Sequence, residues 1–296
     1  MEPEQQDNPL MTLWERQSVW SQAANQVKHG INRARFWALL LAITGAVLST
    51  AAAQFGPFNA TVGWVLGLLS AIVLALAPAA GRGATATATR DWTRLRSVSE
   101  AYKTEVYTFL AGVAPYRGED RQSVLLHRCQ KVADEASDLL RYTGGITGRR
   151  RQLPAVHDVA SFIELRVNAQ IAGYYRPKAA EYRRRLSRLR VIEVGLAAAA
   201  ALLAAVTGFF PAAHLGAWVA VVTTLGVAVA THVAAQRYEY QQVEFTRTAD
   251  QLEDLRSRYA IGEFDPDTFV AAAEQVISIQ NDAWMVKLVS GEEPAA

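Results

Sequence analysis

Four long apolar blocks alternate with polar, arginine-rich segments along the chain. The blocks cover about residues 36–54, 62–80, 191–210 and 214–235, and the only charged residue inside them is Glu193. Each block is close to the roughly 20 residues that a helix needs to cross the hydrocarbon core of a bilayer. The pattern predicts an all-α integral membrane protein with four spans, arranged as two tandem helical hairpins with long amphipathic cytoplasmic helices.

Basic residues lie at the open end of each predicted hairpin, and not at its turn. Lys or Arg precedes the first and third blocks and follows the second and fourth, as in Lys28, Arg82, Arg188 and Arg237. The connections at 55–61 and 211–213 contain neither residue type. The positive-inside rule therefore predicts a multi-pass protein with both termini and the central region in the cytoplasm.

The two predicted hairpins begin at Phe36 and Val191, and each stands between a basic amphipathic helix and a second long helix. This order predicts a duplicated unit of helix, hairpin and helix, with both copies in the same orientation. The turn-rich basic segment 143–154 predicts the boundary between the two units, which would then cover residues 9–150 and 151–290.

Seven-residue apolar repeats mark the helices outside the blocks. Such a repeat predicts a coiled-coil-like seam, either within one subunit or between subunits. Two further helices are predicted, one over about 119–141 and one starting at Asp265-Pro266, an N-cap followed by proline. The repeats are Leu13, Trp20, Val27 and Ala34; Leu95, Tyr102 and Phe109; and Tyr238, Phe245, Leu252 and Tyr259.

Small residues recur every four positions in the second and fourth blocks. In lipid, such a stripe lets helix backbones approach closely and is a main route to helix association. The stripes predict packing seams that act either inside one chain or between chains. The predicted helix-packing positions are Gly63, Gly67, Ala71, Ala75, Gly216, Ala220 and Ala228.

Polar side chains inside the blocks are few, and Thr223, Thr224 and His232 are the candidate pore or gate residues. The threonines can instead bond back to their own helix. His232 lies near the predicted cytoplasmic end of its span, where it could be an interfacial residue or line a wet, pH-sensitive vestibule. Glu193, one turn from Arg190, is expected to form a local salt bridge.

Other classes of function find no support in the sequence. The net charge of +2 gives no argument for nucleic acid, and a single cysteine, Cys129, excludes an intramolecular disulfide. The five histidines lack metal-ligand spacing, and neither a P-loop nor a nucleophile elbow is present. We therefore expect no enzyme and no cofactor. The arginine triplets at 149–151 and 183–185 favour contact with anionic lipid headgroups, and the acidic N-terminus predicts no cleavable signal peptide.

Four segments flank the two predicted hairpins: LWERQSVW, RSVSEAYKTEVYTFLAGVAPY, RVNAQIAGYYRPKA and FVAAAEQVISIQNDAW. In these segments and in its duplicated order of elements, the chain resembles the SLATT superfamily (SMODS- and SLOG-associating two-transmembrane effector domains). The resemblance covers nearly the whole chain as two tandem copies. It implies a bacterial membrane effector that oligomerises into pores in the plasma membrane and is triggered by a nucleotide second messenger or a sensor protein.

Two hypotheses of function remain from the sequence. The first is a homo-oligomeric, ion-conducting pore in the lipid bilayer, gated from the cytoplasm. The packing stripes, the seams and the very short outer turns favour it. The second is a membrane-anchored scaffold, in which the spans only tether cytoplasmic helices that bind a soluble partner.

Overall fold

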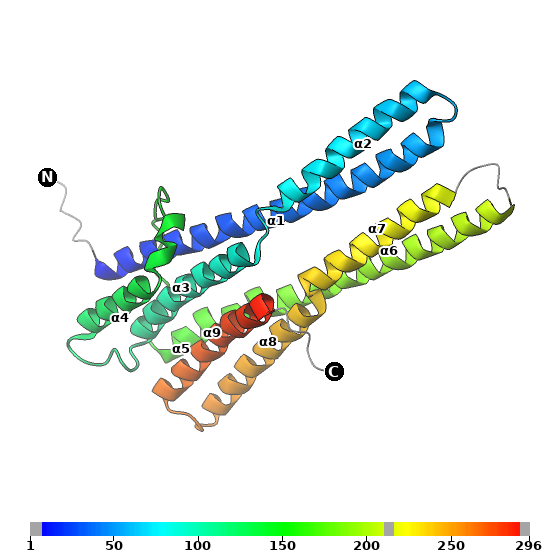
Figure 1. Ribbon diagram of the computed structural model, residues 1–296. Coiled ribbons are helices and arrows are strands. Elements are labelled where there is room, and N and C mark those ends of the chain that lie inside the picture. Colours follow the sequence, from blue (N-terminus) through cyan, green and yellow to red (C-terminus); the bar gives the residue numbers. More distant parts are fainter. Residues whose placement is uncertain (1–7, 210–215, 291–296) are drawn as a thin grey trace. The chain divides into compact units, whose positions relative to one another are not determined.

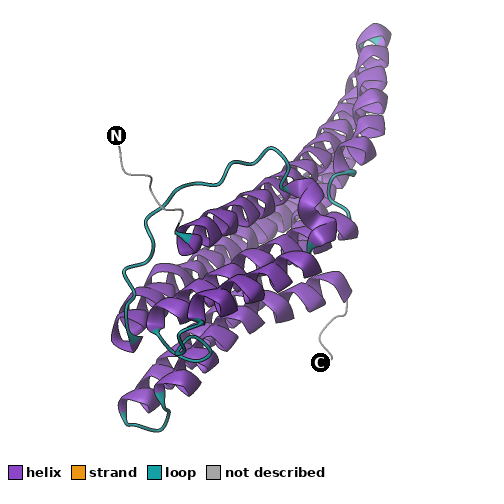
Figure 2. Cartoon of the chain, turned by 90° about the vertical axis from the view of Figure 1, so that its left-hand side faces the viewer, coloured by secondary structure: helices purple, strands orange, loops and turns teal. Residues whose placement is uncertain are grey.

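The computed structural model describes residues 8–209 and 216–290, which contain only helices and loops (Figure 2). The predicted all-helical class is confirmed. The predicted turn at 211–213 and its neighbours Phe210 and His214 lie outside the described residues. In chain order the elements are α1 (Pro9–Phe55), α2 (Ala60–Gly81), α3 (Ala86–Ala111), α4 (Arg121–Glu135), the 3-10 helix η1 (Ser137–Tyr142), α5 (Val159–Phe162), the π-helical segments η2 (Ile163–Asn168) and η3 (Ile171–Tyr175), α6 (Arg176–Phe209), α7 (Gly216–Gln236), α8 (Tyr238–Ala260) and α9 (Pro266–Ser290).

Amphipathic and apolar segments join in continuous helices. The predicted helix before the first block and the block itself form one 47-residue helix, α1. The third block likewise continues from the arginine-rich start of α6, which has 34 residues. Backbone hydrogen bonds within a helix do not depend on side-chain polarity, so a change from polar to apolar side chains does not by itself end a helix.

Three helical stretches of the described chain are long and apolar enough to cross a membrane, namely Pro9–Phe55, Ala60–Ala111 and Val159–Phe209. A fourth apolar stretch, Gly216–Thr231, is shorter. These stretches indicate a membrane protein. The fourth span and the orientation of the spans stay predictions.

The chain forms two compact units that do not follow chain order. We call the first the helical bundle; it comprises the described residues of Met1–His29, Ala86–Lys178 and Glu244–Ala296. The second, the hairpin unit, comprises Gly30–Thr85 and the described residues of Ala179–Val243. Both halves of the sequence contribute to each unit. The predicted boundary near residue 150 concerns the order of the repeat along the chain, and it stays a prediction.

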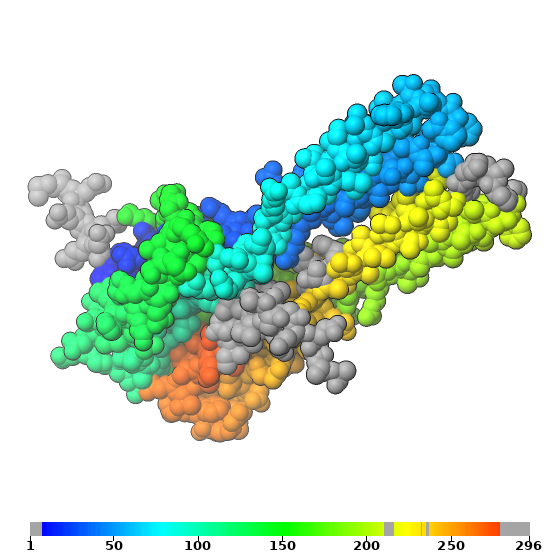
Figure 3. Space-filling view, in the orientation of Figure 1, coloured from blue at the N-terminus to red at the C-terminus, as the bar shows by residue number. Residues whose placement is uncertain are grey.

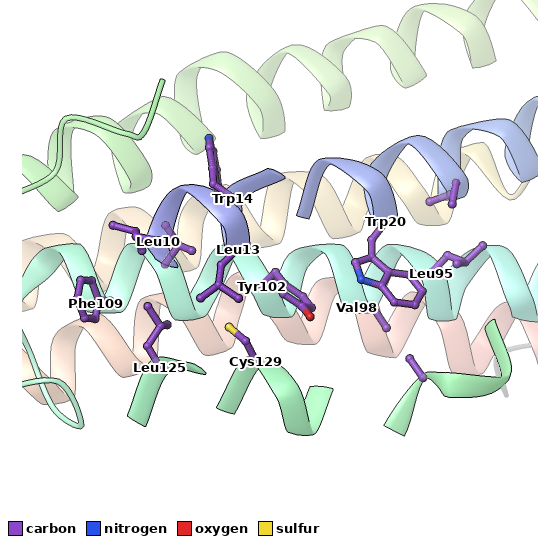
Figure 4. Packing of buried hydrophobic residues seen from close by; sticks show 14 of the residues in the cluster. Leu10, Leu13, Trp14, Trp20, Leu95, Val98, Tyr102, Phe109, Leu125 and Cys129 are labelled. Carbon is purple, nitrogen blue, oxygen red and sulfur yellow. The ribbon is translucent and has the colours of Figure 1, made fainter. Parts of the chain in front are cut away.

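One core of the helical bundle joins α1, α3, α4 and η1. Leu13 and Trp20 of α1 meet Leu95 and Tyr102 of α3, and Cys129 of α4 closes the cluster (Figure 4). Burial raises the pKa of the Cys129 thiol to about 12, so this side chain acts as a small apolar residue. The first predicted seam as far as Val27, and the second seam, therefore pack within one chain.

A second core of the helical bundle joins α5, η2, η3, α8 and α9. Phe162, Leu252 and Phe269 are fully buried there, and Phe245 and Tyr259 pack against them. The third seam, from Phe245 to Tyr259, thus also packs within one chain. Asp265 accepts hydrogen bonds from the backbone N–H groups of Asp267 and Thr268, which confirms the predicted cap of α9.

The basic linker after η1 lies along α1 within the helical bundle. Trp14 Nε1 donates to the carbonyl of Gln152 at 3.2 Å, and the Arg149 amide donates to Ser18 Oγ at 2.7 Å. Arg150 pairs with Glu15 at 2.9 Å, and Arg151 lies over the Trp14 ring. Arg150 and Arg151 thus have partners on α1, and the lipid contact of this arginine triplet stays a prediction.

Candidate functional site

The first predicted packing stripe lies on α2, and the structure divides it into two parts. A Cβ added to Gly63 would lie 2.6 Å from the Cα of Gly56, so at this point the stripe brings α2 against the turn that follows α1 (Figure 1). Gly67 has nothing within 4 Å of such a Cβ. Ala71 and Ala75 are exposed.

The helix period explains why the stripe leaves the hairpin. A four-residue step on an α-helix turns about 40° beyond a full turn, so a stripe at this spacing winds around the helix. The face of α2 that meets α1 continues instead through Ser70, which is buried and donates to the Gly45 carbonyl at 2.8 Å. Ala71 and Ala75 consequently lie off the face that closes the hairpin.

The second stripe lies on α7. A Cβ added to Gly216 would lie 3.7 Å from Cγ2 of Thr207 on α6, an ordinary contact within the second hairpin. Ala220 is exposed and Ala228 is half-buried. This stripe also divides between a contact inside the hairpin and exposed surface.

The candidate pore residues Thr223 and Thr224 are both exposed on α7. Their hydroxyls donate to the carbonyls of Val219 and Ala220, each at 2.8 Å. These bonds satisfy the hydroxyl donors within the helix and leave acceptor lone pairs outward. The side chain of His232 lies outside the part of the chain that the structure describes.

Large apolar side chains cover the outside of both hairpins. Trp64 of α2 is 79% exposed, and Leu202 of α6 is 68% exposed. Each hairpin is two helices thick, so most of its side chains lie on its surface (Figure 3). An apolar surface of this extent is rare on soluble monomers and requires lipid or another protein around it.

A buried ion pair, which the sequence analysis did not predict, lies inside the helical bundle. Arg166 of η2 and Glu274 of α9 are 2% and 3% exposed. Arg166 Nε and one of its terminal nitrogens donate to the two Glu274 carboxylate oxygens at 2.8 and 2.9 Å. This bidentate geometry is the strongest that an arginine forms with a carboxylate.

Helix α3 completes the surroundings of this pair. Thr104 Oγ1 donates to Glu274 at 2.7 Å, and the Tyr107 ring centroid lies 4.6 Å from the Arg166 guanidinium carbon. Burial alone would lower the pKa of Arg166, but the Glu274 carboxylate overcomes it and raises that pKa. Arg166 is therefore charged at every physiological pH.

A second carboxylate, Glu100 of α3, extends this charged cluster. Burial opposes its ionisation, but Arg96 at 2.7 Å and Lys103 at 2.9 Å hold its pKa below the usual value. Burial lowers the pKa of Lys103, and Glu100 opposes that effect. The cluster thus ties α3, from the first half of the chain, to η2 and α9 from the second half.

A signal for the pair was present in the sequence. Glu274 stands four positions after Val270 and three before Ile277, both of which are buried. Arg166 likewise stands four positions after the buried Phe162. A charged residue on the apolar face of a helix is rarely left unpaired. Nothing local, however, connects two residues that are 108 positions apart.

The described residues hold no group of three or more His, Cys, Asp or Glu side chains that could bind a metal. The features that the structure does show are the packing stripes of the two hairpins and the ion-pair cluster of the helical bundle.

Comparison with protein families gives two matches. Residues 162–284 match the family described as SMODS and SLOG-associating 2TM effector domain 1. Residues 18–123 match a family described as a protein of unknown function (DUF4231). No curated protein and no solved structure matches the chain.

The first of these matches runs from the end of α5 through α6, α7 and α8 into α9, and so contains the second hairpin. The other runs from α1 through α2 and α3 into α4, and contains the first hairpin. Residues 162–284 are thus similar to a domain described as a two-transmembrane effector, and the apolar helices of the chain fit a membrane protein.

Proposed function

We propose that this protein is an oligomeric membrane effector whose four spans form a pore gated from the cytoplasm. The exposed parts of the two stripes carry this proposal, since Ala71, Ala75 and Ala220 are not used to close their own hairpins. The match of residues 162–284 to a domain described as an effector supports the proposed effector role. The first hairpin acts as a second, divergent copy of that domain.

Small residues on a lipid-exposed helix face favour a helix from another subunit as partner. Apolar side chains gain little from meeting each other in lipid, whereas close backbone contact gains van der Waals packing. The exposed face at Ala71 and Ala75 therefore serves as a contact between subunits. Hairpins two helices thick cannot enclose a channel singly, so several subunits must form the wall.

The threonine pair of α7 provides a polar, exposed face for the pore. With the donors of Thr223 and Thr224 satisfied by helix carbonyls, their oxygen atoms can coordinate water or a cation. His232, about two turns after Thr224 along α7, would stand at the cytoplasmic mouth. The remaining lining is apolar, which fits a pore that is dry when closed.

Gating is assigned to the helical bundle. Helix α1 begins in the bundle at Pro9 and ends in the hairpin unit at Phe55, so a change in the bundle acts on a span through one continuous helix. The trigger would be a nucleotide second messenger or a sensor protein that binds the bundle. The setting is a bacterial conflict or defence system in the plasma membrane, with both termini cytoplasmic.

The pore is tested by membrane potential in bacterial cells that express the full chain. Strong induction should depolarise the cells, read with a voltage-sensitive dye. The Thr223→Val/Thr224→Val variant should reduce the effect severalfold, because valine keeps the shape but removes both oxygen atoms. A Thr246→Val variant on α8, in the helical bundle, serves as the control. Unchanged potential at high membrane levels of the protein would count against the pore.

A scaffold is the second candidate, and the size of the helical bundle favours it. The spans would then serve only as anchors. Replacing both hairpins by unrelated apolar hairpins of equal length separates the two functions. Under the pore proposal the swapped protein no longer depolarises cells, whereas a scaffold would keep its biological effect.

A further inference from the structure

A cavity of about 410 Å³ lies in the hairpin unit, between α6 and the first turns of α8. Arg183, Ser187 and Arg190 of α6 line one side, at positions that share a helix face. Glu239 and Gln242 of α8 line the other side. The size is within the roughly 300–1,000 Å³ of small-ligand sites.

The two arginines of this cavity are available to a ligand. Among the described residues, neither Arg183 nor Arg190 forms an ion pair or hydrogen bond, in contrast to the neighbouring Arg185, which pairs with Glu181. The salt bridge expected between Arg190 and Glu193 is not formed. Among the described lining residues Glu239 is the only acidic one, so these residues give the cavity a net positive charge.

The rim of the cavity is apolar. Val191 and Val243 line it and are 70% and 56% exposed. Val191 is also the first residue of the apolar part of α6, so basic and apolar surfaces meet at the cavity. A ligand that fits both has an anionic head and an apolar tail.

We infer that this cavity binds the phosphate group of an anionic phospholipid, with its acyl chains along the apolar part of α6. Arg183 and Arg190 would each give charge-assisted hydrogen bonds to the phosphate oxygens, and Ser187 would add a neutral donor. The inference rests on the proposed membrane insertion of the second hairpin. A specific lipid there would hold α6 against α8, the two helices that join this hairpin to the helical bundle.

A soluble phosphate compound shares this chemistry, but the lining favours the lipid. Base recognition normally uses aromatic stacking, and no aromatic residue is among the described lining residues. The valine rim, in contrast, matches an acyl chain. Inorganic phosphate therefore provides the comparison ligand.

The test is native mass spectrometry of the full chain released from nanodiscs that contain equal amounts of phosphatidylglycerol and phosphatidylcholine. We expect the wild-type protein to retain phosphatidylglycerol preferentially. Arg183→Gln/Arg190→Gln should reduce that retention about tenfold or more, given the strength of arginine–phosphate contacts. Arg184→Gln/Arg188→Gln is the matched control, since it removes equal charge from the same helix but outside the cavity. The control should change retention less than about threefold.

Two results would overturn the inference. Equal losses in both double variants would show a diffuse attraction instead of a site. Tight binding of inorganic phosphate in lipid-free detergent, lost in the Arg183→Gln/Arg190→Gln variant, would show a soluble anion as the ligand. Recovery of the protein in nanodiscs of phosphatidylcholine alone reports membrane insertion separately, so a failure of the lipid site is distinguishable from a failure of the proposed function.

Discussion

Replacing Glu274 by alanine is expected to lower the free energy of unfolding of the helical bundle by about 3–5 kcal/mol. The substitution leaves the Arg166 guanidinium 2% exposed and without its carboxylate acceptor, and it stays charged because an arginine side chain does not lose its proton in proteins. It also removes the acceptor of Thr104 Oγ1. Uncompensated burial of a charge is among the most costly single changes in a protein interior. Thermal denaturation followed by circular dichroism, with hydrogen exchange of α3 and α9, measures the effect.

Two further variants isolate the cause. Arg176→Ala breaks a largely exposed pair with Glu253, whose atoms lie 2.9 Å apart, and should cost at most about 1 kcal/mol. Arg166→Met combined with Glu274→Leu removes both charges and should recover most of the lost stability. Similar melting of the Glu274→Ala and Arg176→Ala proteins would contradict the role given to the buried pair.

Gly63→Leu is expected to disrupt the first hairpin. The added Cβ alone would stand 2.6 Å from the Gly56 Cα and 3.4 Å from the Ala52 carbonyl oxygen. Both are backbone atoms, so no side-chain rotation relieves the clash, and the helices must separate near their turn. Overpacking of this kind costs about 1–3 kcal/mol or more. The fraction that stays monodisperse in detergent after heating should fall.

Gly195→Leu is the matched control for this variant. It places the same side chain in the apolar part of α6, where a Cβ would meet nothing within 4 Å. We expect its heat resistance to equal that of the wild-type protein. If Gly63→Leu were equally tolerated, the packing described for α2 would be incorrect.

The sequence predicts the helices well, because their signals are local. Seven-residue repeats identified Leu13, Leu95 and Leu252 as core positions, and all three are buried. Asp265 and Pro266 identified the start of α9. Capping, periodicity and block length each depend on residues within a few turns, so a single sequence is enough to predict the helices.

The sequence could not predict the features that depend on how distant segments of the chain pack together. The Arg166–Glu274 pair depends on the packing of η2 against α9, and the cavity at Arg183 and Arg190 depends on α8. The division of the α2 stripe depends on how far a four-residue spacing winds around the helix. Spacing alone did not show that Gly63 closes the hairpin while Ala71 is exposed.

The most direct test of the account is the number of subunits, by native mass spectrometry of the full chain in mild detergent. Stoichiometry does not depend on whether the gate is open. Ala71→Phe, which adds bulk at the proposed contact between subunits, should dissociate the assembly, whereas Leu69→Phe off the stripe should not. For the wild-type protein we predict one defined ring of three or more chains, as a central pore requires. A stable monomer would contradict the pore, because the hairpins of one chain could not enclose a channel.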